Sequence, residues 1–230
     1  MAALLAAAIF RRNIGVEVSL FSHYAFPETV IDWFQLLQNN RLVGLSYLNL
    51  FDVVNYGLLG LMFLALYWLL KSVNKSLMII AAVSGLVGMT ASFATNSALS
   101  MLSLSNQYAI ATTQVQQATF LAAGQAMLAI SNQPGVISQS TGAYASFLLM
   151  ALAGLFASLV MLRSNVFPRL CSYLGILASI LDLVYCVAVV IVPTDVARLV
   201  GLGTLPLAGL LLMLWHLWIG WKLIRLAIGK

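Results

Sequence analysis

The sequence predicts an all-α fold: a polytopic transmembrane helix bundle of about five spans, with one external amphipathic or re-entrant helix. Three observations support this. Hydrophobic residues make up 62% of the 230 residues and charged residues only 7%, whereas soluble domains contain about 25% charged residues. The mean hydropathy is +1.01. The apolar residues also gather in runs long enough to cross a bilayer, which requires about 20 residues.

Four runs reach that length and are interpreted as spans over roughly 42 to 70, 77 to 99, 142 to 162 and 170 to 192. A fifth, about 203 to 221, contains Pro206 near its start, where a proline is tolerated. We therefore expect residues 41–230 to form the transmembrane bundle.

The N-terminal run MAALLAAAIF, residues 1–10, is too short to cross a bilayer. Its positive charges, Arg11 and Arg12, follow the run, whereas a signal peptide carries them before it. We interpret residues 1–40 as an N-terminal arm with a truncated or degenerate first span, and a surface anchor is the alternative.

Residues 105–140 separate the second and third spans. They begin with the polar stretch SNQYAIATTQVQQ, continue with the apolar run ATFLAAGQAMLAI and end at the turn sequence SNQPG. A run of about 13 residues suits an interfacial or re-entrant helix better than a span. We therefore expect an external loop and helix here.

Positive charges predict the orientation of the bundle, because short cytoplasmic loops collect Lys and Arg. One side of the membrane would carry Lys71, Lys75, Arg163, Arg169, Lys222, Arg225 and Lys230. The other side would carry Arg41 and Arg198. We expect a cytoplasmic C-terminus and an external segment 105–140. The net charge of +5 is scattered over span ends, so it does not indicate nucleic-acid binding.

Trp215, Trp218 and Trp221 precede Lys222 and Arg225, which is the pattern of an interfacial aromatic belt. We assign His216 to this belt rather than to a ligand site. The two cysteines, Cys171 and Cys186, lie about 22 Å apart along one predicted helix, too far for a disulfide.

Two carboxylates, Asp52 and Asp182, fall inside predicted spans. A charge at the centre of a span is unfavourable by about 2.5 to 3.5 kcal/mol, so such residues indicate function by default. Each lies eleven residues from its predicted outer boundary, or about 16 Å. We expect both near the bilayer midplane at matched depth.

Their neighbours at helical spacing extend this candidate polar site. Around Asp52 we predict one polar face in a continuous helix, and around Asp182 a seam of small residues that faces protein rather than lipid. The seam comprises Ser172, Gly175, Ser179, Asp182 and Cys186, and the second span has a similar one of Ser84, Gly88, Ser92 and Asn96. The candidate site residues are Asn49, Asp52, Asn55, Tyr56, Ser179 and Asp182.

No pattern in the sequence indicates a catalytic site, a metal centre or a cofactor. His23 and His216 are some 190 residues apart, so a His-based metal site is not expected. Gly201, Gly203 and Gly209 lack the strand that a dinucleotide loop requires. No GxSxG motif marks a serine nucleophile, and we do not expect an enzyme. An intramembrane enzyme is a distant third option, which would require a Ser or Asp pair within hydrogen-bond reach in a wet pocket.

Several stretches carry a resemblance to a known family. They are NRLVGLSYLNLFDVVNYGLLGLMFLALY, ALSMLSLSNQYAIATT with LAAGQAMLAI, and VMLRSNVF followed by YLGILAS. Over roughly residues 30 to 180 the chain resembles the bacterial membrane family named domain of unknown function 4386. The resemblance implies a bacterial inner-membrane protein of roughly six spans, without a mechanism. The chain departs from the family in its short first span and in Gln114, Gln116 and Gln117, where relatives often have charged residues.

Two functional hypotheses follow. In the first, the protein binds or passes a small solute or lipid through the midplane polar groups, which requires Asp52 and Asp182 to line one cavity. In the second, it is an accessory or structural membrane protein, and the carboxyls stabilise helix packing by about 0.6 to 2 kcal/mol per hydrogen bond. The expected partners are the lipid bilayer and a small solute or lipid.

Overall fold

The computed structural model describes residues 26–131 and 140–228, and these residues form helices without strands. Five helical segments are long and apolar enough to cross a membrane: Asp52–Leu70, Lys75–Ile110, Thr141–Arg163, Arg169–Ile191 and Thr194–Leu226. The predicted fold class, a transmembrane helix bundle of about five spans, is confirmed. The N-terminal run 1–10, Arg11, Arg12, His23 and Lys230 lie outside the described residues.

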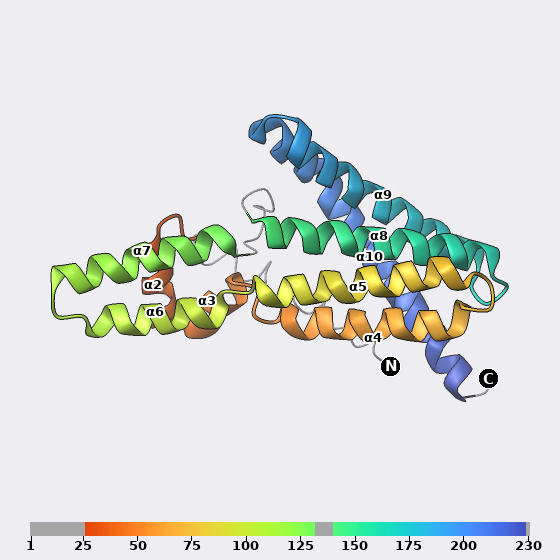
Figure 1. Cartoon of the computed structure of the whole chain (residues 1–230), viewed down its shortest axis with the longest axis horizontal. Coiled ribbons are helices and arrows are strands. Elements are labelled where there is room, and N and C mark those ends of the chain that lie inside the picture. Colours follow the sequence, from red (N-terminus) through yellow and green to blue (C-terminus); the bar gives the residue numbers. More distant parts are fainter. Residues whose placement is uncertain (1–25, 132–139, 229–230) are drawn as a thin grey trace.

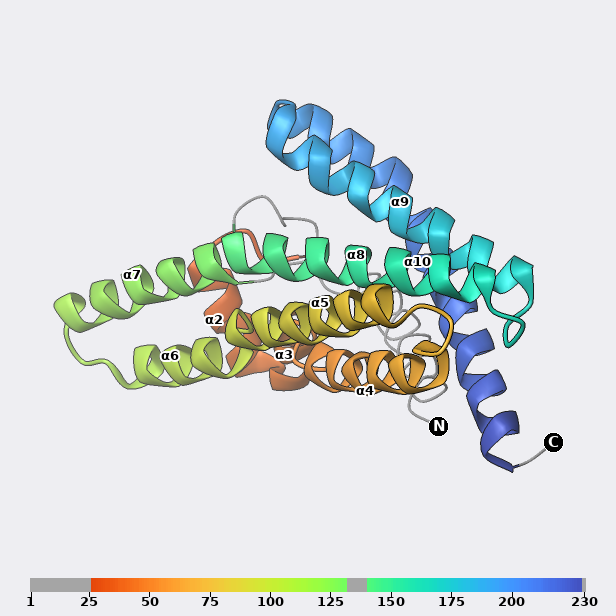
Figure 2. The ribbon, with the colours of Figure 1, turned by 45° about the vertical axis from the view of Figure 1, so that its right-hand side comes forward.

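The bundle consists of helices α4 (Asp52–Leu70), α5 (Lys75–Ala94), α8 (Thr141–Arg163), α9 (Arg169–Ile191) and α10 (Thr194–Ile228). Helix α5 lies between α4 and α8, α8 packs on α9, and α9 packs on α10. Figures 1 and 2 show α4, α5 and α8 along the long axis, with the α9 and α10 pair crossing them obliquely. Their shared core contains fully buried side chains such as Met62, Leu66 and Trp215.

A second helical cluster, here named the lobe, lies beyond one end of the bundle (Figure 1). It consists of α2 (Val30–Asn39), α3 (Arg41–Tyr47), α6 (Ala98–Ile110) and α7 (Gln114–Ile130). The lobe has its own core, which includes Trp33, Phe34 and Met101. The segment expected as an external loop and helix is thus the end of α6 followed by α7, packed as a hairpin over α2.

A break at Asn49 separates the lobe from α4. The prediction of one continuous span over 42 to 70 is wrong, because α3 ends at Tyr47 and α4 begins at Asp52. Asn49 has a φ of 58°, a left-handed conformation that Asn adopts more readily than most residues. The side-chain amide of Asn96, at the junction of α5 and α6, donates a hydrogen bond to the Asn49 carbonyl at 2.9 Å. The two junctions therefore lie side by side.

Helices α5 and α6 follow one another almost in line (Figure 1) and together form an apolar segment of 36 residues. Such a segment is about 54 Å long, compared with a hydrocarbon core of about 30 Å. The lobe therefore extends beyond the hydrocarbon layer when α5 spans it.

Small residues bring the bundle helices close together, as predicted for the seams. A Cβ on Gly88 would lie 3.1 Å from the Ser146 carbonyl oxygen, and the Ser146 hydroxyl donates to the Gly88 carbonyl at 2.8 Å. On α9 the seam residues Ser172, Gly175, Ser179, Asp182 and Cys186 are all buried. The expectation that this face meets protein is confirmed, and Cys171 and Cys186 are both free.

Cationic residues gather where α4 turns into α5, where α8 turns into α9, and at the end of α10. These three places lie at the end of the bundle opposite the lobe (Figure 1). Lys71 lies over the ring of Trp68 with 3.5 Å from Nζ to the ring centroid, and the Arg225 guanidinium carbon lies 3.8 Å over the Trp221 ring. The described residues of this cationic end are Lys71, Lys75, Arg163, Arg169, Lys222 and Arg225.

Trp215 does not belong to an interfacial belt, and that prediction is wrong. The side chain is 1% exposed and packs in the bundle core, whereas Trp221 is 43% exposed. The reason is the packing of α10 on α9, where a Cβ on Gly175 would lie 2.5 Å from the Trp215 Nε1, so the indole fills the space beside this glycine.

Candidate functional site

A cavity of about 310 Å³ lies inside the bundle, between α4, α8, α9 and α10. Apolar side chains form most of its wall, including Leu59, Met150 and Leu212. Six residues with polar atoms in their side chains also line it: Asn55, Tyr56, Ser179, Asp182, Trp215 and His216. An apolar cavity with a few convergent polar groups is the usual form of a small-molecule site.

The structure brings together four of the six residues expected at the polar site. Asn55 and Tyr56 of α4 and Ser179 and Asp182 of α9 line this cavity. Each pair comes from one helix, and both helices pack against α8, so α4 and α9 contribute separate parts of the cavity wall.

Asn49 and Asp52 are not among the residues that line the cavity. Asn49 lies in the break between α3 and α4, and Asp52 is the first residue of α4. Asp182 lies near the middle of α9. The expectation that Asp52 lies inside a continuous helix is therefore wrong, because the chain turns at Asn49 and α4 begins only at Asp52. The matched depth of the two carboxyls in the membrane stays a prediction.

Asp182 is a buried carboxyl that is 6% exposed. In the part of the chain that the structure describes, no hydrogen bond or ion pair joins it to another residue. The Asn55 side chain, 9% exposed, likewise has no hydrogen-bond partner among the described residues. Buried polar groups are normally hydrogen-bonded, so these two side chains offer free hydrogen-bonding capacity to the cavity.

Tyr56 connects the cavity to the seams between α5 and α8. Ser92 of α5 and Ser146 of α8 lie near its hydroxyl, and Asp52 and Asp182 are both close enough to act on it electrostatically. The phenol ring therefore forms the part of the cavity wall that faces these seams.

Further polar atoms are buried without a partner among the described residues where α8, α9 and α10 meet. They are the hydroxyl oxygens of Ser158, Ser172 and Ser179 and the indole nitrogen of Trp215. A Cβ on Gly154 would lie 2.7 Å from the Ser179 Oγ, and one on Gly175 would lie 2.5 Å from the Trp215 Nε1. The absence of a side chain at these two glycines makes room for the polar atoms of the neighbouring helices.

Aromatic rings form another part of the wall. Tyr56, Phe63, Phe147 and Trp215 line the cavity together with the imidazole of His216. The ring of Phe147 is held edge-on against Tyr185, with 6.1 Å between their centroids. These rings come from α4, α8 and α10, so the cavity is aromatic on more than one side.

The sequence reading missed Trp215, His216 and Phe147 as cavity residues. A signal was present on α10, because Leu205, Gly209, Leu212 and His216 recur at spacings of three and four and mark one helix face. The charges that follow Trp221 favoured a belt interpretation instead.

A comparison with protein-family models gives a match that covers nearly all of these helices. A family model described as "Domain of unknown function (DUF4386)" matches residues 18–222. The chain belongs to this family. The match includes both the lobe and the bundle cavity, and it confirms the resemblance seen in the sequence. No curated protein and no solved structure matches the chain.

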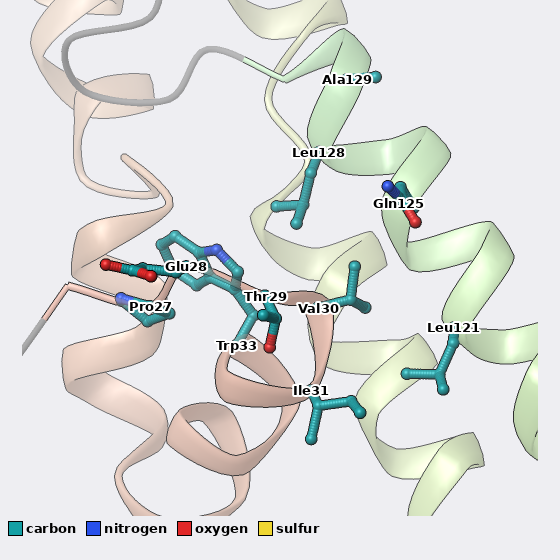
Figure 3. Close-up of a pocket in the computed structure, with 10 residues that line it drawn as sticks. All are labelled: Pro27, Glu28, Thr29, Val30, Ile31, Trp33, Leu121, Gln125, Leu128 and Ala129. Carbon is teal, nitrogen blue, oxygen red and sulfur yellow. The ribbon is translucent and has the colours of Figure 1, made fainter.

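This DUF4386 chain also has a hollow of about 540 Å³ in the lobe, between the start of α2 and α7. Figure 3 shows Leu121 and Leu128 of α7 pointing toward α2 across it. Thr29 is engaged there, since its hydroxyl and backbone N–H both donate to the Asp32 carboxylate. None of the described buried polar atoms without a partner lines this hollow, so the bundle cavity is the better candidate site.

The described part of the DUF4386 chain contains no group of three His, Cys, Asp or Glu side chains that could hold a metal ion. Asp182 and His216 line the same cavity, yet they are two groups on two helices without a third ligand. The arrangement suits the binding of a molecule better than the coordination of a metal.

Proposed function

We propose that this DUF4386 protein binds a small, largely apolar molecule in the bundle cavity, as a membrane-embedded receptor or carrier site. One observation carries the proposal: the Asp182 carboxyl and the Asn55 amide face an apolar cavity without partners among the described residues. Leaving buried polar groups unsatisfied is unfavourable by about 1 to 3 kcal/mol each. A ligand that bonds to them would remove that penalty.

The packing of the helices supports entry from the bilayer. Helix α4 packs on α5 and α8, whereas α10 packs on α9, and α4 and α10 do not pack along each other. Both nevertheless contribute to the cavity wall. We expect a membrane-dissolved molecule to enter between α4 and α10, where side chains rather than packed backbones close the wall.

The orientation that we propose places the cationic end in the cytoplasm and the lobe outside a bacterial inner membrane. The positive-inside rule supports it, since six of the eight described Lys and Arg residues gather at one end, whereas Arg41 lies in the lobe and Arg198 near the start of α10.

Helix packing alone, the alternative function, explains fewer of the observations. The small-residue seams are occupied by neighbouring helices of the same chain, such as Gly88 against Ser146 and Gly154 against Ser179. They are therefore not free to receive a partner, and packing does not account for the unpartnered Asp182.

Filling the cavity provides the experiment. Gly209 lines the cavity on α10, and Gly209→Leu would place a side chain inside it. Gly203 is the matched control on the same helix, because a Cβ there meets nothing within 4 Å. The purified protein in lipid nanodiscs is irradiated with a small aryl diazirine, and the labelled peptides are mapped by mass spectrometry.

We expect labels on the cavity segments of α4, α8, α9 and α10 in the natural protein and in Gly203→Leu, and their loss in Gly209→Leu. Equal labelling of all three proteins, or labels restricted to the lipid-facing surface, would refute a binding cavity at this place.

A further inference from the structure

We infer that the molecule bound in the bundle cavity is a small organic cation, an ammonium group on an apolar body. This inference rests on the proposed function and specifies the chemistry of its ligand. Three features of the described residues support it: an unpaired carboxyl, the absence of a fixed cation in the cavity wall, and a set of aromatic rings.

The first feature is the carboxyl of Asp182. It is buried, it lines the cavity, and it has no ion-pair partner among the described residues. A buried carboxylate is stable when a cation or hydrogen-bond donors are paired with it. No described residue is hydrogen-bonded or ion-paired to it, and no Lys or Arg among the described residues lines the cavity, so a cationic ligand would supply the missing positive charge.

The second feature is the composition of the wall, whose described residues include no Lys or Arg. The described cations of the bundle lie at the ends of its helices, as with Lys71 and Arg225. His216 is the one basic side chain among the described residues that line the cavity, and no ion pair joins it to Asp182. An anionic ligand would thus meet a carboxyl and no permanent countercharge.

The third feature is the group of aromatic rings that line the same cavity: Tyr56, Phe63, Phe147 and Trp215. The face of an aromatic ring is negatively polarised and attracts ammonium groups, most strongly when they are desolvated. Rings on several sides of a cavity combined with one carboxyl form a recognition site for an organic cation. The remaining apolar wall would accept the body of the ligand.

Two compounds of the same shape separate the effect of the ligand's charge from the effect of its shape. Benzyltrimethylammonium has a quaternary nitrogen where neopentylbenzene has a quaternary carbon, so the first carries a permanent positive charge and the second is neutral. Binding of each to the full-length protein is measured by equilibrium dialysis in nanodiscs of zwitterionic lipid, with empty nanodiscs as the blank.

We expect the ammonium compound to bind about tenfold more tightly than its neutral isostere, the factor that corresponds to a cation–π and charge contribution of this kind. Asp182→Asn should remove this preference and leave the affinity for neopentylbenzene within about twofold. Asp52→Asn is the matched control, since Asp52 does not line the cavity, and it should keep the preference. Phe147→Leu should weaken the ammonium compound more than the neutral one and serves as a second variant if Asp182→Asn does not fold.

The outcomes distinguish the two proposals. If both compounds bind equally and Asp182→Asn changes neither, the cation assignment is overturned while the binding cavity remains. Tighter binding of benzenesulfonate than of the ammonium compound would overturn it in the same way. If neither compound binds, or Gly209→Leu leaves their binding unchanged, the binding cavity itself is refuted.

Discussion

Asp182 shows how a single residue can oppose stability in the empty protein. Its carboxyl is buried and has no hydrogen-bond partner among the described residues, and it occupies a position where the neighbouring side chains are apolar, such as Leu59 and Met150. Natural proteins retain such unfavourable groups mainly where function needs them.

We therefore expect Asp182→Leu to raise the free energy of unfolding of the ligand-free protein by about 1 to 3 kcal/mol, because it removes an unsatisfied polar group. The measurement is the apparent Tm in detergent, compared with that of the natural protein. Asp52→Leu is the control, and it should lower stability slightly because a carboxylate in the first turn of a helix is favourable. A loss of several kcal/mol in Asp182→Leu would mean that the carboxyl has a stabilising partner.

Asn49 shows what a sequence reading could not predict at the scale of one residue. The run from Leu42 to Leu70 is apolar throughout, so a hydropathy window sees a single span. The break depends on one left-handed backbone conformation and on the hydrogen bond from Asn96, which joins residues 47 positions apart. Neither contributes to hydropathy, and both decide that Asp52 begins a helix.

Helix α2 illustrates local stabilisation at the scale of an element. Its start is a capping box in which Thr29 and Asp32 bond to each other's backbone groups. Hydrogen bonds from the Thr29 side chain and backbone lower the pKa of the Asp32 carboxyl below its ordinary value of 3.8. The carboxylate therefore stabilises α2 above that value, and this stabilisation is lost as the pH falls through the lowered pKa.

We expect α2 to become more susceptible to pepsin as the pH falls below 3.8, because protonation weakens the cap. Asp32→Asn is compared at each pH, which cancels the pH dependence of the protease itself. At the higher pH values the natural protein should be cleaved more slowly than Asp32→Asn. At the lower pH values, where Asp32 is protonated, the two proteins should be cleaved at the same rate. A constant ratio of the two cleavage rates across this pH range would show that the Thr29–Asp32 cap does not control the protection of α2.

Helices α9 and α10 differ in how well their sequences predicted their roles. On α9 the spacing of Ser179, Asp182 and their small neighbours correctly indicated a buried face, because small residues permit close packing. On α10 the same kind of spacing was present, but the nearby charges suggested an interface. The contacts of Trp215 depend on the oblique crossing of α9 and α10 over the other helices (Figure 2), which is a tertiary property.

The molecule as a whole divides into a bundle core and a lobe core. Composition and run lengths predicted the bundle, since about 20 apolar residues are needed for each span. The lobe was harder to predict, because α6 and α7 carry no charged residue and their sequences resemble weak spans. Their packing against α2 and α3 involves residues distant in sequence, as in the bond from Ser105 to Phe34.

The proposed orientation can be tested with single cysteines at the two ends of the molecule. Thr112 lies between α6 and α7 and is exposed, and Val73 lies in the turn between α4 and α5 and is 39% exposed. A membrane-impermeant maleimide applied to intact spheroplasts should label Thr112→Cys and not Val73→Cys. The native Cys171 and Cys186 are buried and should add little background. Labelling of Val73→Cys alone would reverse the orientation.

Helix α10 connects the cavity to the thickness of the membrane. With 35 residues it is about 52 Å long, longer than a hydrocarbon core of about 30 Å, and tilting is one way in which such a helix matches the bilayer. A thinner bilayer demands a larger tilt, and α10 supplies Leu205, Gly209 and Leu212 to the cavity wall. If α10 tilts in this way, the acyl-chain length of the surrounding lipids would change the position of these three residues and so the shape of the cavity.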